Sequence, residues 1–169
     1  MLGLTSSLDL FEAIVDDMEK RGTTAIYSAV IEAVRMLRPV FASNPNADLR
    51  VLLLTDGQSN AGASPEAALL ECNEIGAVVD AIIVGDTPDH NLRKIVAATG
   101  GSCFQIRTLA EGFELMEAEA VVSLKARRGG ADKPPFVKRE MPAGGFQSVQ
   151  AQHIVAGRQA QSVAAKPKA

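Results

Sequence analysis

The stretch Arg50-Val51-Leu52-Leu53-Leu54-Thr55-Asp56-Gly57-Gln58-Ser59-Asn60 decides the fold of this chain. Its first half is an unbroken apolar and β-branched run, which suits a strand covered on both faces in a parallel sheet. The Asp56-Gly57 pair then turns the backbone and leaves the Asp56 carboxylate at the carboxyl end of the strand. Ligands of open α/β sheets bind at this end, so Asp56 is a candidate binding residue. The alternative is that Asp56 only stabilises the turn.

The segments around this strand alternate between helical and extended patterns. Helices are expected over 6–21, 23–38, 64–75 and 89–99, with further strands over 78–85 and 102–106 and a last helix from Thr108 that bears Leu109, Phe113, Met116 and Ala120. Pro39 is expected to stop the second helix. Alternation of this kind predicts right-handed βαβ units. We therefore predict an α/β fold, a partial doubly wound (Rossmann-like) parallel sheet of about three strands with flanking helices. No strand precedes the first two helices, so the first half of the module looks absent.

Composition indicates one domain with an aliphatic core. The 169 residues are 47% hydrophobic and contain no Trp. No apolar run approaches the ~20 residues that span a bilayer, and the first residues do not resemble a secretory signal. These observations predict a cytoplasmic protein without a membrane span. Cys72 and Cys103 lack metal-ligand spacing and are expected to be buried, reduced thiols.

Charge divides the chain into two segments. Residues 125–169 hold nine Lys or Arg and two acids, whereas residues 1–124 hold eight basic and eighteen acidic residues. The second segment is rich in Pro, Gly, Ala and Gln, and we predict a folded domain over 1–124 and a basic, largely disordered tail over 125–169. The tail lacks interleaved aromatic residues and a repeated spacing, which argues against nucleic-acid binding.

Hydroxyl and carboxylate groups converge at one border of the predicted sheet. Thr23 and Thr24 begin a helix, Asp56 ends the strand after it, and Asp86 ends the next strand. Oxygen ligands of this kind suit Mg²⁺, which keeps several waters and needs few protein groups. Thr24 could equally cap its helix, and we interpret Asp86 as a turn residue. The predicted metal ligands are Thr24 and Asp56.

Four segments together resemble the von Willebrand factor type A domain. They are Gly22-Thr23-Thr24-Ala25-Ile26-Tyr27-Ser28-Ala29-Val30, the stretch 52–60, Val79-Asp80-Ala81-Ile82-Ile83-Val84-Gly85, and Ile95 to Phe104 with its Thr99-Gly100-Gly101 sequence. The resemblance covers roughly residues 4–123. It implies a protein-binding module with a metal-ion-dependent adhesion site, where Mg²⁺ or Mn²⁺ is held by an Asp-x-Ser-x-Ser loop, a Thr and an Asp. A carboxylate of the partner protein completes the coordination.

This sequence keeps only part of that site. Thr24 matches the family's Thr, with Thr23 as the near alternative, and Asp56 matches its Asp, but no stretch fits the Asp-x-Ser-x-Ser loop. We therefore expect weak or absent Mg²⁺ binding by the isolated chain. The strand that carries the loop is also missing, so the edge of the 51–55 strand is expected to be exposed and to favour self-association.

Three functions remain to be compared. The leading one is a non-enzymatic protein-binding module. An alternative is a Mg²⁺-dependent phosphoryl-transfer enzyme that uses Asp56 and Asp86, although no Gly-rich Lys loop is present. The third is a truncated copy of the domain without any ligand.

Overall fold

The computed structural model describes residues 5–17, 19, 22–108, 110–112, 115 and 137–156. Its helices are α1 (Leu8–Asp16), α2 (Ile26–Ser43), α3 (Pro65–Ile75), α4 (His90–Thr99) and the short 3₁₀ helix η1 (Phe146–Ser148). Its strands are β1 (Arg50–Thr55), β2 (Val78–Val84), β3 (Cys103–Ile106) and β4 (Ile154–Ala156). The three strands expected from the sequence are all present.

The strands form one parallel sheet in the order β1-β2-β3-β4. Leu53 is in register with Ala81, and Ile83 with Gln105. Helices α3 and α4 connect successive neighbouring strands, as right-handed crossovers do in a sheet of this class. The predicted α/β fold with a parallel sheet is confirmed.

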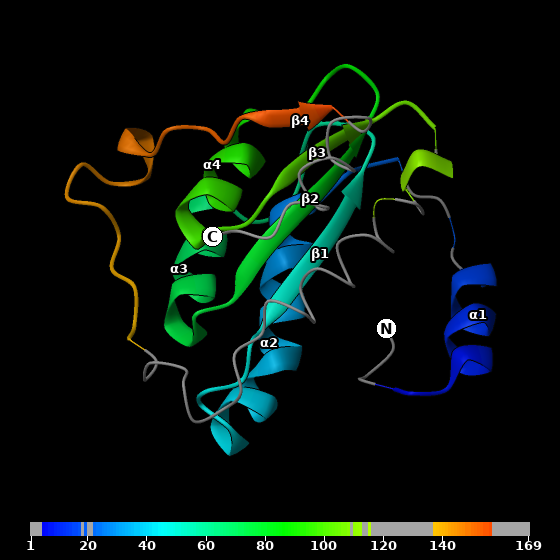
Figure 1. The fold of residues 1–169 in the computed structure, drawn as a ribbon, viewed down its shortest axis with the longest axis horizontal. Coiled ribbons are helices and arrows are strands. Elements are labelled where there is room, and N and C mark those ends of the chain that lie inside the picture. Colours follow the sequence, from blue (N-terminus) through cyan, green and yellow to red (C-terminus); the bar gives the residue numbers. More distant parts are fainter. Residues whose placement is uncertain are drawn as a thin grey trace, which may run out of the picture.

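Helices α2, α3 and α4 cover one face of the sheet (Figure 1). Two crossovers in the same direction with the same hand place their helices on the same side, which explains this layer. The main core lies between these helices and the sheet, and its fully buried members are aliphatic or small: Val30, Val34, Ala68, Leu69, Cys72, Ala77, Val79, Ala81, Ile83, Leu92, Ile95 and Val96. Helix α1 stands apart from this layer and buries none of its residues in the described structure (Figure 1).

The opposite face of the sheet is covered unevenly. Over β2 and β3 a small cluster of Ile82, Phe104, Ile106 and Leu115 is buried. Over β1 the same face is open, because Leu52 is 54% and Leu54 is 56% exposed. The prediction of a strand buried on both faces is therefore wrong for β1, since the described residues place a helix layer on only one of its sides.

Helix α2 runs through Pro39 rather than stopping there. A proline inside a helix removes one backbone hydrogen bond. The residues after it, Val40 and Phe41, pack against the main core, and this burial holds the next turn in place. The prediction that Pro39 ends the helix is wrong for this reason.

Residues 137–156 differ from the predicted disordered tail. Phe146 is buried in the main core, and the Arg93 guanidinium donates to the Gln152 carbonyl at 2.7 and 2.9 Å. The Lys94 ammonium lies 5.4 Å from the centre of the Phe146 ring, within the range of a cation–π contact. These contacts hold the segment against α4. The segment then returns to the sheet and forms β4, which pairs with β3.

Capping hydrogen bonds begin several helices where the sequence predicts them. Ser64 accepts from the Ala67 amide at 3.2 Å, Asp89 from the Leu92 amide at 2.9 Å, and Thr108 from the Glu111 amide at 3.3 Å. The last helix is described only in part. Leu109, Phe113, Met116 and Ala120, which were expected to form its apolar face, lie outside the described residues.

Candidate functional site

The segment before α2 is tied to the loop that follows β1. The Thr24 amide donates to the Asn60 side-chain oxygen at 2.8 Å, and the Asn60 amide donates to the Thr24 carbonyl at 2.9 Å. The Ser59 hydroxyl donates to the same carbonyl at 3.3 Å and accepts from the Ile26 amide at 3.2 Å. Thr24 and the Asp56 loop therefore share the carboxyl border of the sheet, as the sequence argument requires.

Asp89, the N-cap residue of α4, forms hydrogen bonds that hold this border together. Its carboxylate accepts from the Tyr27 hydroxyl at 2.6 Å, the Ser59 amide at 2.9 Å and the Leu92 amide at 2.9 Å. It thus joins α2, the loop after β1 and the start of α4. Asp89 is only 6% exposed, so the bonds compensate for a carboxylate removed from water.

The pKa of Asp89 reflects a competition between burial and hydrogen bonding. Burial acts to raise this pKa, but the hydrogen bond from Tyr27 and those from the backbone amides of Leu92 and Ser59 together outweigh it. The resulting pKa lies below the ordinary value of an aspartate. Burial, with the neighbouring Asp89, raises the pKa of the Tyr27 phenol, which stays neutral and keeps donating its proton.

The side chains of the two predicted site residues, Thr24 and Asp56, do not take part in hydrogen bonds within the described structure. Asp56 is exposed and Thr24 is half-buried. Within the described residues, neither the Asp56 carboxylate nor the Thr24 hydroxyl makes a hydrogen bond. Thr24 does not cap α2 with its side chain, because α2 starts at Ile26 without a side-chain cap. Both groups are available to an external partner.

Asp86 occupies the matching position after β2. Its carboxylate is exposed and accepts from the Gln105 side chain at 3.5 Å, a weak contact. Gln105 donates more closely to the Gly85 carbonyl, at 2.5 Å. Asp86 therefore lies on the same border as Asp56 but in a turn of its own, in keeping with the interpretation of Asp86 as a turn residue.

The amino border of the sheet holds a different arrangement. The Arg50 guanidinium donates to both carboxylate oxygens of Asp80 at 2.6 to 2.8 Å, and the Ser102 amide donates to the same carboxylate at 2.9 Å. A side chain on Gly101 would overlap the Val79 carbonyl oxygen, so only glycine fits there. The Asp80 carboxylate and the Arg50 Nε and Nη2 donors are thus bonded within the fold.

The donors present do not make a complete site for Mg²⁺. Thr24 and Asp56 supply one hydroxyl and one carboxylate, whereas magnesium favours six oxygen ligands in near-octahedral geometry. Across the parts of the chain that the structure describes, no three His, Cys, Asp or Glu side chains are grouped to hold a metal ion. The described residues therefore do not fit a tightly held Mg²⁺ of the kind that the resemblance implies.

Sequence reasoning missed the residues that build the border. Ser59, Asn60 and Tyr27 were noted only as parts of the quoted segments, and Asp89 only as the first residue of an expected helix. Their position in a polar loop directly after a strand could have indicated that Ser59 and Asn60 bond to neighbouring loops. The contact of Asp89 with Tyr27, 62 positions away, has no local signal.

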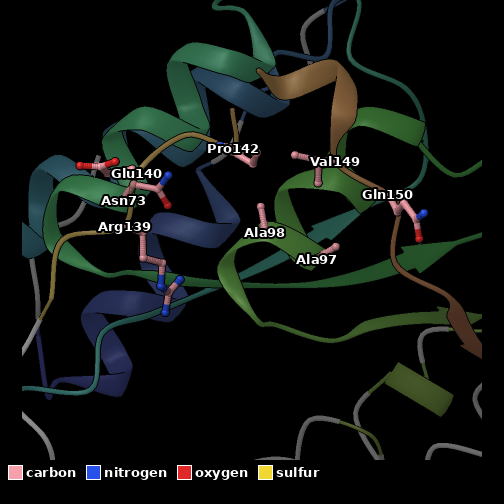
Figure 2. A pocket seen from close by; sticks show the side chains of 8 residues that line it. All are labelled: Asn73, Ala97, Ala98, Arg139, Glu140, Pro142, Val149 and Gln150. Carbon is pink, nitrogen blue, oxygen red and sulfur yellow. The ribbon is translucent and has the colours of Figure 1, made fainter. Parts of the chain in front are cut away.

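A cavity of about 380 Å³ lies between α3, α4 and the returning segment 137–150. Figure 2 shows Pro142, Ala98 and Val149 gathered around it, with Asn73, Glu140 and Arg139 towards one side. The Asn73 side-chain oxygen is shielded from solvent and has no hydrogen-bond partner among the described residues. The Arg139 guanidinium is held by the Thr99 carbonyl at 2.7 Å. Four of the eight lining residues are apolar and Arg139 is already bonded, which leaves Asn73, Glu140 and Gln150 as its remaining polar side chains.

Both cysteines are free and buried, as predicted. Burial raises the pKa of the Cys72 thiol to about 12 and that of the Cys103 thiol to about 11. A thiol with such a pKa carries almost no thiolate at neutral pH, and the thiolate is the reactive form. Burial and the raised pKa values argue against a nucleophilic role for Cys72 and Cys103.

No described helix is both long and apolar enough to cross a bilayer. The cytoplasmic placement stays a prediction.

The fold and the border define a class of protein: a parallel α/β domain with an oxygen-bearing border at the carboxyl ends of its strands. The model of the von Willebrand factor type A domain matches residues 3–118, and the chain belongs to this family. Domains of this family generally mediate protein–protein interactions and are generally non-enzymatic.

One curated relative is the "Probable bifunctional E2/E3 enzyme R795" of Acanthamoeba polyphaga mimivirus. It is 25% identical to this chain over 123 residues, which cover 70% of the chain and 10% of the relative. The chain thus spans about a tenth of the length of that relative. No solved structure matches the chain.

Proposed function

We propose that this chain is a non-enzymatic protein-recognition module that binds its partner at the carboxyl border, through the Thr24 hydroxyl and the Asp56 carboxylate. The observation that carries the proposal is the contrast within this border. Asp89, Ser59 and Asn60 are engaged in fixing the backbone, whereas Thr24 and Asp56 present free side chains on the backbone so fixed. Binding groups held on a preorganised frame lose little entropy when a partner arrives.

A degenerate metal-ion-dependent adhesion site follows from the same donor set. Two protein ligands leave most of the coordination of Mg²⁺ to water, so the ion binds weakly to the chain alone. An acidic residue of the partner adds a further oxygen ligand. We infer that the chain favours partners with an exposed Asp or Glu at the contact.

Titration calorimetry with Mg²⁺ and with Mn²⁺ tests the metal part of the proposal. The expected result is no binding tighter than the millimolar range. Tight binding to the chain alone would show that it holds more ligands than Thr24 and Asp56. This outcome would overturn the degenerate site without touching the recognition role.

Selection of peptides from a random display library on the immobilised chain, in a buffer with excess Mg²⁺, tests the recognition role. Peptides enriched on the wild type should carry acidic residues and should lose binding to Asp56→Ala. Asp86→Ala is the matched control, because Asp86 is also an exposed aspartate after a strand of the same border. Equal loss in both variants, or enrichment of peptides that ignore Asp56, would contradict the proposal.

The mimivirus relative raises the question of whether this chain itself has the activity of an E2/E3 enzyme. Acyl transfer through a cysteine thioester needs an accessible thiolate. The only cysteines of the sequence, Cys72 and Cys103, are buried with raised pKa values. This supports a recognition role for the chain rather than a catalytic one. No described group favours the phosphoryl-transfer alternative, and we do not extend the proposal to it.

A further inference from the structure

The open edge of β1 carries a self-complementary pattern. Its exposed side chains, in order, are basic Arg50, apolar Leu52, apolar Leu54 and then acidic Asp56 just beyond the strand. In the reverse direction the order is acid, leucine, leucine, base, so each charge of one strand meets the opposite charge of an antiparallel copy. Two copies of such a strand, laid side by side in opposite directions, match charge with opposite charge and leucine with leucine.

The backbone groups that face this edge can be assigned from one hydrogen bond. The Val78 amide donates to the Leu49 carbonyl at 2.9 Å, and successive residues of a strand direct their backbone groups to opposite sides. Odd-numbered residues of β1 therefore bond to β2. The amides and carbonyls of Arg50, Leu52 and Leu54 point to the other side, where the described residues provide no neighbouring strand.

We propose that β1 pairs antiparallel with β1 of a second copy of this chain, with Leu53 lying opposite Leu53 of the partner subunit. This inference goes beyond the proposed recognition function and does not depend on it. The pairing is isologous, with a two-fold axis through Leu53, and joins the two sheets into one continuous sheet.

The hydrogen-bonding parity is satisfied when the two-fold axis passes through any residue of β1, and charge and packing select among these registers. With the axis at Leu53, Leu52 faces Leu54 of the partner subunit as a hydrogen-bonded pair. Asp56 then faces Arg50 of the partner subunit. An axis at Leu52 or at Leu54 instead places a charged residue opposite a leucine at both ends. A shift of the partner strand by one residue would place an even-numbered residue opposite an odd-numbered one. The facing side chains would then lie on opposite faces of the sheet, and the backbone hydrogen bonds would be lost.

The exposed leucines supply the apolar part of the contact. Leu52 and Leu54 are more than half exposed and lie on the face of β1 that the described residues leave open. The two-fold axis brings four leucines together on this face. Arg50 bonds to Asp80 through its Nε and Nη2 atoms, so its Nη1 donors can take a second carboxylate.

Sedimentation of the full chain across a concentration series, in EDTA, tests the dimer. The wild type should show a monomer–dimer equilibrium, and Leu54→Lys should weaken it roughly tenfold or more, because it places a charge among the leucines. Leu70→Lys on α3 is the matched control, since Leu70 is 51% exposed and Leu54 is 56% exposed. A wild type that stays monomeric, or equal effects of the two variants, would overturn the proposal.

Cysteine scanning tests the register. At the non-hydrogen-bonded Leu53 pair the Cα atoms lie about 4.5 Å apart, a separation that a disulfide spans. Leu53→Cys should therefore form a covalent dimer under mild oxidation, whereas Leu52→Cys and Leu54→Cys should not. Cross-linking of one of these two in place of Leu53→Cys would overturn the register.

Hydrogen exchange at the Leu52 and Leu54 amides distinguishes the dimer from coverage of the β1 edge within one chain. Protection that rises with protein concentration supports the dimer. Protection that is independent of concentration means that another segment of the same chain covers β1, and it would overturn the proposal. This readout needs no variant, so it decides even where Leu53→Cys fails to fold.

Discussion

The two borders of the sheet use their polar residues in opposite ways. At the amino border Arg50, Asp80 and the Ser102 amide bond to one another, and Gly101 leaves no space for a side chain. At the carboxyl border a buried aspartate secures the loops and an exposed one is left free. The difference teaches that the bonded polar groups of the amino border stabilise the fold, whereas the carboxyl border combines a bonded frame with free side chains, which we propose as the contact for a partner.

Gly101→Ala is expected to have the largest effect on stability. The added Cβ would overlap the Val79 carbonyl, a backbone atom that cannot move without disturbing β2, at a cost of about 3 kcal/mol. Gly57→Ala at the carboxyl border is the matched control, because its Cβ would meet nothing within 4 Å. Urea unfolding of both variants measures the difference. Equal losses would mean that the two borders are packed alike.

Asp89→Ala is expected to rank second. It removes a helix cap and leaves the Tyr27 hydroxyl and the Ser59 amide without their acceptor, at a cost of about 2 to 3 kcal/mol. Tyr27→Phe removes one of these bonds and should cost about 1 kcal/mol. Thermal or urea unfolding gives the values. A neutral Asp89→Ala would show that the frame does not depend on this carboxylate.

Acid should weaken the same frame in the wild type. The folded-state pKa of Asp89 lies below its ordinary value, so its ionisation adds stability above about pH 4. That stability is lost as the pH falls through the folded-state pKa. The melting temperature of the wild type should therefore drop more steeply below about pH 4 than that of Asp89→Asn. Parallel curves for the two proteins would rule out this contribution.

Asp56→Ala is expected to change stability least, by less than about 0.5 kcal/mol, because its carboxylate is exposed and bonds to no described residue. The same variant should lose the binding of peptides selected on the wild type. This separation of stability from binding sharpens the contrast with Asp89. A large loss of stability in Asp56→Ala would mean that Asp56 serves the frame as well.

Local sequence patterns predicted a large part of this molecule. The run that ends at Thr55, the Ser64 and Asp89 caps and the glycines after α3 and α4 fix where elements begin and end, because each acts within a few residues. The alternation of strand and helix then gave the parallel sheet. It also gave the shared border of Thr24 and the Asp56 loop, since parallel strands all end on the same side.

Only the tertiary structure decided the rest. Helix α2 continues past Pro39 because Val40 and Phe41 reach the core, and the segment 137–156 is held by Arg93, Lys94 and β3 although its composition favours disorder. Asp89 joins α2 and the loop after β1 through partners 62 and 30 positions away. Propensity and capping act between neighbours in sequence and can be read there. Burial and long-range hydrogen bonds depend on which distant segments meet, and that is settled only when the chain has folded.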